Sequence, residues 1–228
     1  MIRLISDFDG VIVDLSERYY QVYLWRLAQV RSPDQQITTL SKSDFWQLKQ
    51  QKASQTEIAL QSGLSTDQIP LFKKLRDDHA HRLENMVHDR PIPAAIAALQ
   101  LAQDLDWEIM TVTMRRTSEL AEAFRLYPEL NPYFPGDRRF TIPDNAERNK
   151  DLDQKPQLLA QTLAQLPPHD RTWMVGDTEA DIRAAQSHNI PAIAVLSGIR
   201  DRQTLETYQP DFIVQNLLEA VQLIQSRS

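Results

Sequence analysis

Short apolar runs that stop at acidic, glycine or other turn residues constrain the fold of this chain more than any other feature. They occupy residues 2–6, 107–113, 171–175, 191–196 and 211–214, with a shorter β-rich stretch at 139–142. Runs of this length predict buried strands of a parallel sheet, both faces of which are covered. Helical patterns fill the intervals, in residues 93–104, 117–126, 156–166, 178–188 and 216–226. The alternation predicts an α/β fold with helices on both faces of the sheet.

Residues 15–90 interrupt this alternation with a long stretch that has almost no strand pattern. Helices are predicted there at residues 15–30, 43–52, 55–62 and 67–88. The inner face of the last helix is predicted to consist of three leucines, Leu71, Leu75 and Leu83. We therefore expect an α/β core domain of residues 1–14 and 91–228, with an all-α domain of residues 15–90 inserted after the first strand.

Composition and charge exclude several classes of protein. The 228 residues carry a net charge of −6, whereas a general nucleic-acid binder normally has a basic excess. The chain has no cysteine, which removes disulfides, Cys-ligated zinc and iron–sulfur clusters. No apolar run approaches the ~18 residues of a membrane span, and acidic residues follow Met1 too soon for a signal peptide. We expect a cytoplasmic protein that binds neither nucleic acid nor membrane.

Side chains that can do chemistry lie at the ends of three predicted strands. Ligands of α/β sheets bind beyond the carboxyl ends of the strands, so these side chains are expected to share one site. They are Asp7 and Asp9 after the first run, Thr113 in the second, Asp177 and Asp181 after the third, and Lys155 before it. Carboxylates this close repel one another, which implies a divalent cation. Ligands that are all oxygen favour Mg²⁺.

The same residues resemble the four motifs of the haloacid dehalogenase (HAD) superfamily, in the superfamily's order. Asp7-Phe8-Asp9-Gly10-Val11 resembles motif I, Thr113 motif II, Lys155-Pro156 motif III, and Gly176-Asp177-Thr178-Glu179-Ala180-Asp181 motif IV. The resemblance implies a Rossmann-like HAD core, and the helical insert resembles a C1 cap domain. The resemblance is to the capped, phosphoglycolate phosphatase-like branch. The second aspartate of motif I, which the dehalogenase branch lacks, implies phosphate ester chemistry.

The resemblance also implies a role for each motif residue in a phosphatase. Asp7 would be the nucleophile that forms an aspartyl-phosphate, and Asp9 the general acid and then the general base. Mg²⁺ would be held by Asp7, the carbonyl of Asp9, Asp177 and Asp181. The phosphate would be bound by Lys155, the Thr113 hydroxyl and backbone N–H groups at Phe8, Asp9 and Met114. The substrate would be a small phosphorylated metabolite.

Several alternatives stay open on the sequence alone. Thr111 lies on the same strand face as Thr113, Lys150 is a rival for Lys155, and an acid in the first turn of a helix also stabilises the helix dipole, as Asp181 would. A phosphomutase of the same superfamily and a non-catalytic phosphate-binding protein are the alternative functions. The sequence does not decide between a monomer and a dimer. It also leaves open the substrate contacts of Arg115, Arg116, Tyr19, Tyr23, Trp46 and Lys49.

Overall fold

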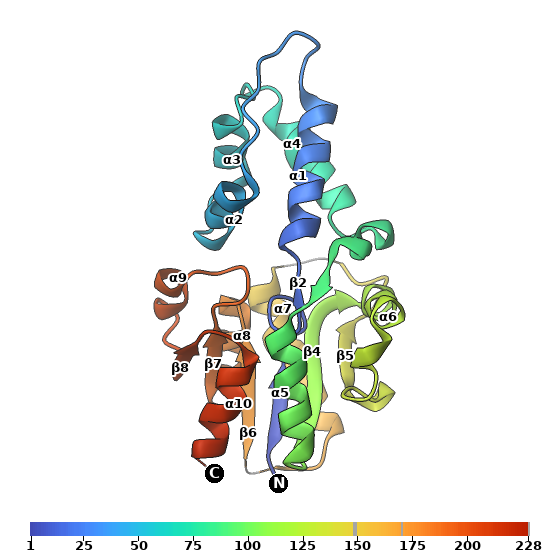
Figure 1. Cartoon of the computed structure of the whole chain (residues 1–228), viewed down its shortest axis with the longest axis vertical. Helices are drawn as coiled ribbons and strands as arrows, with labels where there is room; N and C mark the ends of the chain where they lie inside the picture. The colour runs from blue at the N-terminus through green and yellow to red at the C-terminus, as the bar shows by residue number, and fades with distance from the viewer. Residues whose placement is uncertain (148–149, 170, 228) are drawn as a thin grey trace. The chain divides into compact units, whose positions relative to one another are not determined.

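Two compact units make up the chain in the computed structural model, which describes residues 1–147, 150–169 and 171–227 (Figure 1). The core unit contains Met1–Asp14 and Arg90–Ser228, and the helical unit contains Leu15–Asp89. Residue 90, which the sequence pattern placed with the helices, belongs to the core unit. There β3 (Arg90–Pro91) pairs antiparallel with β2 (Val13–Asp14). Two-residue strands carry no periodicity, so the sequence pattern could not predict this pair.

The core unit is built on a parallel sheet of six strands in the order β5-β4-β1-β6-β7-β8. The strands are β1 (Arg3–Ser6), β4 (Glu108–Arg116), β5 (Arg139–Ile142), β6 (Thr172–Gly176), β7 (Ala192–Val195) and β8 (Phe212–Val214). Every neighbouring pair is parallel, and all four residues of β1 are buried. Strands of a parallel sheet are covered on both faces, and the burial of β1 agrees with this. The arrangement confirms the predicted Rossmann-like α/β fold.

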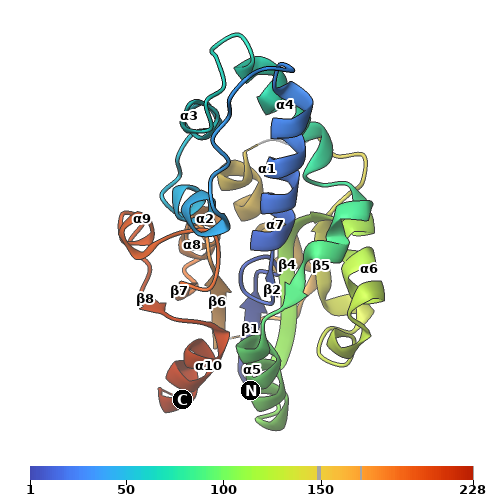
Figure 2. The same ribbon diagram turned by 45° about the horizontal axis from the view of Figure 1, so that its top comes forward.

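Helices cover both faces of the sheet (Figures 1 and 2). On one face α5 (Pro93–Asp104) packs against α10 (Leu217–Ser226), and on the other α7 (Asp151–Gln165) packs against α8 (Glu179–Ser187). The remaining helix of usual length, α6 (Thr117–Leu126), packs on β4 and β5. Short helical turns not predicted from the sequence are η2 (Pro128–Leu130), η3 (Gly136–Arg138) and α9 (Arg202–Glu206).

Helix α7 begins five residues before its predicted start at residue 156. Its first turn contains Asp151 and Asp153, whose negative charges favour the N-terminus of a helix. Pro156 therefore lies inside the helix, not in its first turn, and removes one backbone hydrogen bond there. The earlier start places Lys155 in the second turn of α7, where its side chain is buried.

The helical unit consists of α1 (Ser16–Val30), α2 (Lys42–Gln50), α3 (Gln55–Gln61), α4 (Ile69–His79) and the 3₁₀ helix η1 (Leu83–His88). The single helix predicted at residues 67–88 is wrong, because the chain leaves the helix after His79 and re-enters a tighter one at Leu83. Of its predicted inner face, Leu75 packs against the core of the helical unit, whereas the other two leucines do not. Leu71 and Leu83 are 48% and 43% exposed, whereas Phe72 is fully buried.

Aromatic side chains of α1 and α2 form much of the core of the helical unit. Tyr23 is fully buried, stacks on Phe45 with ring centres 4.7 Å apart, and shares a 2.8 Å hydrogen bond with the Ser62 hydroxyl. Tyr19 stacks on Trp46 at 6.5 Å, and the Lys49 ammonium lies 5.2 Å from the Tyr19 ring. Tyr23 thus has a packing role. No helix among the described residues has the length and apolar character needed to cross a membrane.

Candidate active site

The neighbouring strands β1 and β6 bring the first and the fourth motif together. Ser6 is level with Val175 in the sheet, and the Asp7 N–H donates to the Val175 carbonyl at 2.8 Å. β1 ends at Ser6 and β6 one residue further on at Gly176, so Asp7 and Asp177 both follow directly on neighbouring strand ends. The carboxyl edge of the sheet is where ligands bind in folds of this kind.

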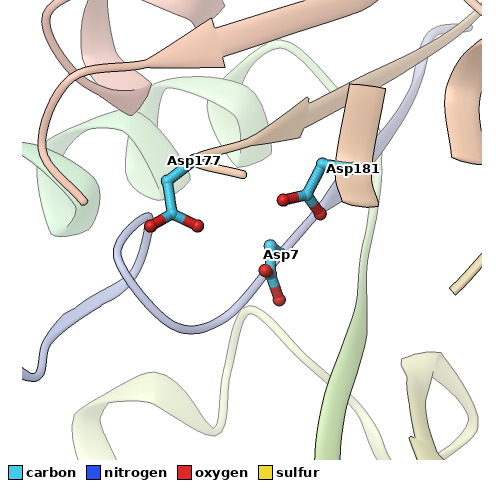
Figure 3. Close-up of side chains that lie close together, drawn as sticks. All are labelled: Asp7, Asp177 and Asp181. Atoms are coloured by element: carbon cyan, nitrogen blue, oxygen red, sulfur yellow. The ribbon is translucent and has the colours of Figure 1, made fainter. Parts of the chain in front are cut away.

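Three buried carboxylates meet at this edge. Asp7, Asp177 and Asp181 each offer one oxygen, and these oxygens all lie within 4.8 Å of one another (Figure 3). Asp7 comes from the end of β1, Asp177 from the end of β6, and Asp181 from the first turn of α8. Three of the predicted metal ligands are therefore in one place.

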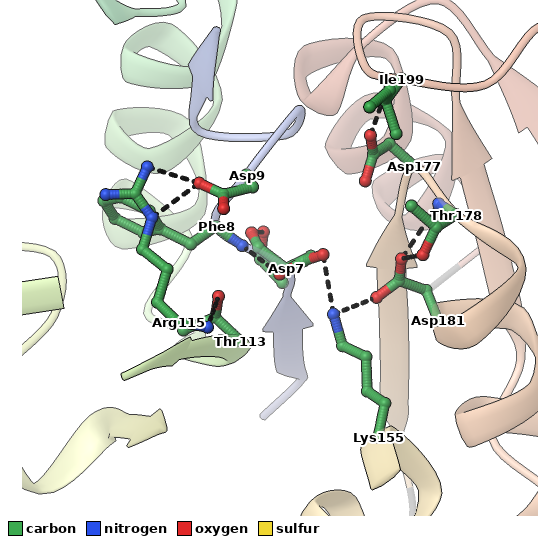
Figure 4. Close-up of polar contacts among 11 residues, drawn as sticks. Asp7, Phe8, Asp9, Thr113, Arg115, Lys155, Asp177, Thr178, Asp181 and Ile199 are labelled. Atoms are coloured by element: carbon green, nitrogen blue, oxygen red, sulfur yellow. Dashed lines mark hydrogen bonds and ion pairs between the residues drawn. The ribbon is translucent and has the colours of Figure 1, made fainter. Parts of the chain in front are cut away.

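Lys155 is the buried cation of this cluster. Its Nζ lies 2.7 Å from Oδ2 of Asp7 and 2.5 Å from Oδ1 of Asp181 (Figure 4). Burial opposes the charge of the lysine, but the carboxylates of Asp181 and Asp7 outweigh it and raise the pKa of Lys155. Lys150, the alternative left open by the sequence, is exposed.

The carboxyl groups of the cluster are held in an environment that disfavours their negative charge. Burial raises the pKa of Asp7 well above its ordinary value, against the opposing attraction of Lys155. Burial and the neighbouring carboxylate of Asp181 raise the pKa of Asp177 to about 7. Three carboxylates that face one ammonium group leave negative charge uncompensated. A divalent, oxygen-seeking cation would supply the missing positive charge, and the donor set fits Mg²⁺.

Asp181 and Asp177 are each fixed by a second contact. Oδ2 of Asp181 accepts hydrogen bonds from the Thr178 hydroxyl at 2.6 Å and the Thr178 N–H at 3.0 Å. Asp181 therefore caps α8 and also belongs to the acidic cluster. Its role as an acid that stabilises the helix is thus compatible with its place among the predicted metal ligands. Oδ2 of Asp177 accepts the Ile199 N–H at 2.7 Å, from the loop after β7.

The side chain of Asp9 points away from the acidic cluster and pairs with Arg115. Nε and Nη2 of the guanidinium lie 2.7 and 2.6 Å from Oδ1 of Asp9 (Figure 4). Arg115 follows Thr113, whose hydroxyl oxygen accepts the Arg115 N–H at 3.2 Å. The acidic cluster of the described residues consists of the carboxylates of Asp7, Asp177 and Asp181. That the backbone carbonyl of Asp9 is a metal ligand stays a prediction.

The predicted phosphate ligands lie on the motif I loop and at the end of β4. The Phe8 N–H donates to Oδ1 of Asp7 at 2.7 Å, so it points at the place where a phosphoryl group would be attached. Thr113 is buried and Met114 is partly buried, in the part of β4 where its register with β5 is irregular. Thr111, the alternative to Thr113, is fully buried between neighbouring strands, opposite Ser6 and Arg139.

The loop after β7 supplies contacts that the motifs did not predict. Besides the Ile199 N–H, the Ser197 hydroxyl donates to the Gly10 carbonyl at 2.7 Å. Arg200 forms an ion pair with Glu179 of motif IV, with Nε 2.8 Å from Oε2. The sequence signal was the glycine at position 198, which follows an apolar run as Gly10 and Gly176 do.

These observations define a class of protein: a Rossmann-like α/β core with an inserted helical unit and a lysine-paired acidic cluster at the carboxyl edge of its sheet. A family model described as HAD-hydrolase-like matches residues 153–220. This match contains the residues of motifs III and IV, and it confirms the predicted resemblance to the haloacid dehalogenase superfamily.

Solved structures of low sequence identity share this fold over nearly the whole chain. A predicted phosphatase from Clostridium acetobutylicum is 17% identical with a TM-score of 0.69, and the match covers 99% of this chain and 98% of that one. A haloacid dehalogenase-like hydrolase from Streptococcus pneumoniae is 22% identical with a TM-score of 0.69, covering 98% of both chains. A predicted phosphoglycolate phosphatase from Haemophilus somnus is 17% identical with a TM-score of 0.66, covering 97% and 96%.

One curated relative matches a shorter stretch. Pyrophosphatase PpaX of Oceanobacillus iheyensis is 28% identical over 81 residues, which are 36% of this chain. The match covers 37% of the length of that relative. The comparisons therefore support the superfamily and its fold, and the activity of this chain is inferred from its own site.

Proposed function

We propose that this protein is a Mg²⁺-dependent phosphatase that hydrolyses a small phosphate monoester through an aspartyl-phosphate intermediate. The observation that carries the proposal is the buried group around Asp7, in which Lys155 contacts one oxygen of Asp7 and two further carboxylates lie within 4.8 Å. Burying these charges is costly, and they are arranged around one carboxylate that faces the ligand-binding edge of the sheet.

Asp7 is the proposed nucleophile. One of its carboxylate oxygens attacks phosphorus, the bond from phosphorus to the ester oxygen breaks, and the electron pair leaves with that oxygen. Lys155, 2.7 Å from Oδ2 of Asp7, compensates the negative charge of the nucleophile and the phosphoryl group. Water then attacks the phosphorus of the aspartyl-phosphate, which releases inorganic phosphate and restores Asp7.

Asp9 is the proposed general acid and general base. Its carboxyl gives a proton to the departing alcohol oxygen and takes a proton from the attacking water in the second step. Asp9 lies two residues after the nucleophile. Its side chain is 28% exposed and that of Asp7 is 9% exposed, so Asp9 is closer to solvent. Two carboxyl groups in such different surroundings can have the different protonation states that the two roles require.

Mg²⁺ would be held by Asp7, Asp177, the carbonyl of Asp9 and, directly or through water, Asp181. When bound, it would offset the negative charge of the phosphoryl oxygens. The proposed ligands of those oxygens are the Thr113 hydroxyl and the backbone N–H groups of Phe8, Asp9 and Met114. We also propose that the helical unit serves as a C1 cap.

The test is phosphate release from a panel of phosphate compounds, measured with Mg²⁺ and with EDTA. The panel includes phosphoglycolate and pyrophosphate, which the names of related proteins suggest, together with sugar phosphates and p-nitrophenyl phosphate. We expect release that requires Mg²⁺ and that is lost in the Asp7→Asn variant, because an amide is a poor nucleophile. Mass spectrometry of the quenched reaction is expected to show one phosphoryl group on the peptide that contains Asp7.

Two results would count against the proposal. Release that persists in Asp7→Asn would assign the chemistry to another group. A folded wild-type protein that binds phosphate with Mg²⁺ but hydrolyses no member of the panel would favour a non-catalytic phosphate-binding protein.

A further inference from the structure

Arg115 is a buried arginine, and two nitrogens of its guanidinium contact one carboxylate oxygen of Asp9. Its side chain is 2% exposed, and two of its nitrogens contact the same atom, Oδ1 of Asp9, at 2.7 and 2.6 Å (Figure 4). Burying an arginine is unfavourable unless its charge is compensated. The paired carboxylate is the group that the proposed function makes the acid and base.

The backbone of β4 aims this side chain at Asp9. Val112 is level with Phe140 of β5, but Arg116 is level with Ile142, so β4 contains extra residues between these pairs. Such a bulge redirects side chains and is common beside active sites. The Arg115 N–H is held by the Thr113 hydroxyl at 3.2 Å.

The ring of Phe8 supports the guanidinium from the side. The Cζ atom of Arg115 lies 5.0 Å from the centre of this ring, within the range of a cation–π contact. Phe8 itself is fully buried and packs on Phe124 with ring centres 5.6 Å apart. Arg115 is therefore fixed by its backbone, by Phe8 and by the ion pair, and it has little freedom to move.

We propose that Arg115 is a positioning residue that fixes the Asp9 carboxyl in the orientation needed for proton transfer to the leaving group. This inference rests on the proposed function of the site. The fork holds Oδ1, and Oδ2 carries the proton that is transferred. When the bond from phosphorus to the ester oxygen breaks, that oxygen takes the electron pair and the proton from Oδ2. Asp9 is left as a carboxylate paired with Arg115.

The test compares two aryl esters of similar shape that differ in their need for a general acid. p-Nitrophenolate is a stable leaving group that departs without a proton, whereas the phenolate of phenyl phosphate is more basic and gains from protonation. The measured quantity is kcat/KM, because it reports the steps up to formation of the aspartyl-phosphate. In Arg115→Met we expect kcat/KM for phenyl phosphate to fall about tenfold to a hundredfold more than that for p-nitrophenyl phosphate.

A double-mutant cycle with Asp9→Asn separates positioning from a general loss of structure. Asp9→Asn alone is expected to show the same dependence on the leaving group, and adding Arg115→Met to it is expected to change kcat/KM little further. Arg115→Lys is expected to recover part of the loss, because lysine keeps the charge but not the planar fork. Arg116→Met is the matched control. It also removes an arginine, but the hydrogen bond of the Arg116 side chain goes to the Ala146 carbonyl, at 3.1 Å, and not to Asp9.

Three results would overturn the inference. Equal losses for the two esters in Arg115→Met would show a role unrelated to the leaving group. A rise in KM with an unchanged ratio between the esters would make Arg115 a substrate ligand. Additive losses in the cycle would show that Arg115 does not act through Asp9. Each is distinguishable from failure of the proposed function, in which wild-type protein itself shows no activity that depends on Asp7.

Discussion

Replacing Gly198 with alanine tests the proposed metal site without removing any of its ligands. Gly198 lies in the loop after β7, where a Cβ added to it would collide with the Cβ, Cγ and Oδ2 atoms of the Asp177 side chain. Asp177 is 2% exposed, so its carboxylate cannot turn into open solvent to avoid the collision. The substitution must displace either the loop or the carboxylate.

The size of the effect follows from the contact that would be lost. The Ile199 N–H donates to Oδ2 of Asp177 at 2.7 Å, and either displacement breaks this bond. A hydrogen bond to a charged group contributes about 1.5–3 kcal/mol. A loss of 1.4 kcal/mol weakens binding about tenfold. Removing a group that hydrogen-bonds to a metal ligand typically lowers metal affinity about 10- to 100-fold. We therefore expect Gly198→Ala to bind Mg²⁺ about tenfold to a hundredfold more weakly.

Isothermal titration of the metal-free protein with Mg²⁺ measures this affinity directly, and the Mg²⁺ concentration that gives half-maximal phosphate release provides a second value. Gly136→Ala is the matched control, because a Cβ added at Gly136 meets no atom within 4 Å. We expect the control to bind Mg²⁺ as the wild-type protein does. If Gly198→Ala and Gly136→Ala bound Mg²⁺ equally well, Asp177 would not be a ligand whose position matters.

Two further perturbations act on the charges of the cluster. In Lys155→Met, Asp7 and Asp181 lose the buried cation that they share. The free energy of unfolding at pH 8 in EDTA is therefore expected to fall by about 3–5 kcal/mol. The control is Lys150→Met, an exposed position, which is expected to stay near wild type, and equal Tm values for the two variants would refute the prediction. Burial and Asp181 raise the pKa of Asp177 from 3.8 to about 7, so the metal-free folded protein retains a proton that the unfolded chain releases, and its stability falls as pH rises through this window. Mg²⁺ must displace that proton, and the gain in Tm on adding Mg²⁺ is expected to grow from pH 5.5 to pH 8; a gain independent of pH would contradict the assignment.

The sequence predicted the sheet and the acidic cluster because both depend on local patterns. Apolar runs marked five of the six strands, and a short stretch at residues 139–142 marked the sixth. The residues after the runs of β1 and β6 had to meet once those strands were neighbours. The clustering of Asp7 with Asp177 needs no more than this placement at the carboxyl edge. The predictions failed where packing decides. Residues 67–88 had a helical pattern throughout, but the buried face is built on Ile69 and Phe72, and the helix ends at His79.

The partner of Asp9 could not be predicted from the sequence for a different reason. Arg115 stands at the end of a strand, where an arginine is equally compatible with solvent, substrate or a buried pair. The outcome depends on the irregular register between β4 and β5 and on the ring of Phe8, both of which are products of the folded sheet. A lysine at the same position would have looked equivalent in the sequence, although its single nitrogen could not replace the two guanidinium nitrogens that contact one oxygen.

The distribution of glycine shows how tightly the chain is built around two carboxylates. Of the five glycines in the chain, three would bring an added Cβ into collision with Asp177 or Asp181. Gly10 and Gly198 pack against the Asp177 side chain, and Gly176 packs against that of Asp181. Gly10 also has a φ of +72°, which other residues rarely adopt. Backbone that approaches this closely holds the carboxylates in a buried place where their charges repel. Such rigidity makes sense for a site completed by a bound cation, because ligands held in place need not be reordered when the cation arrives.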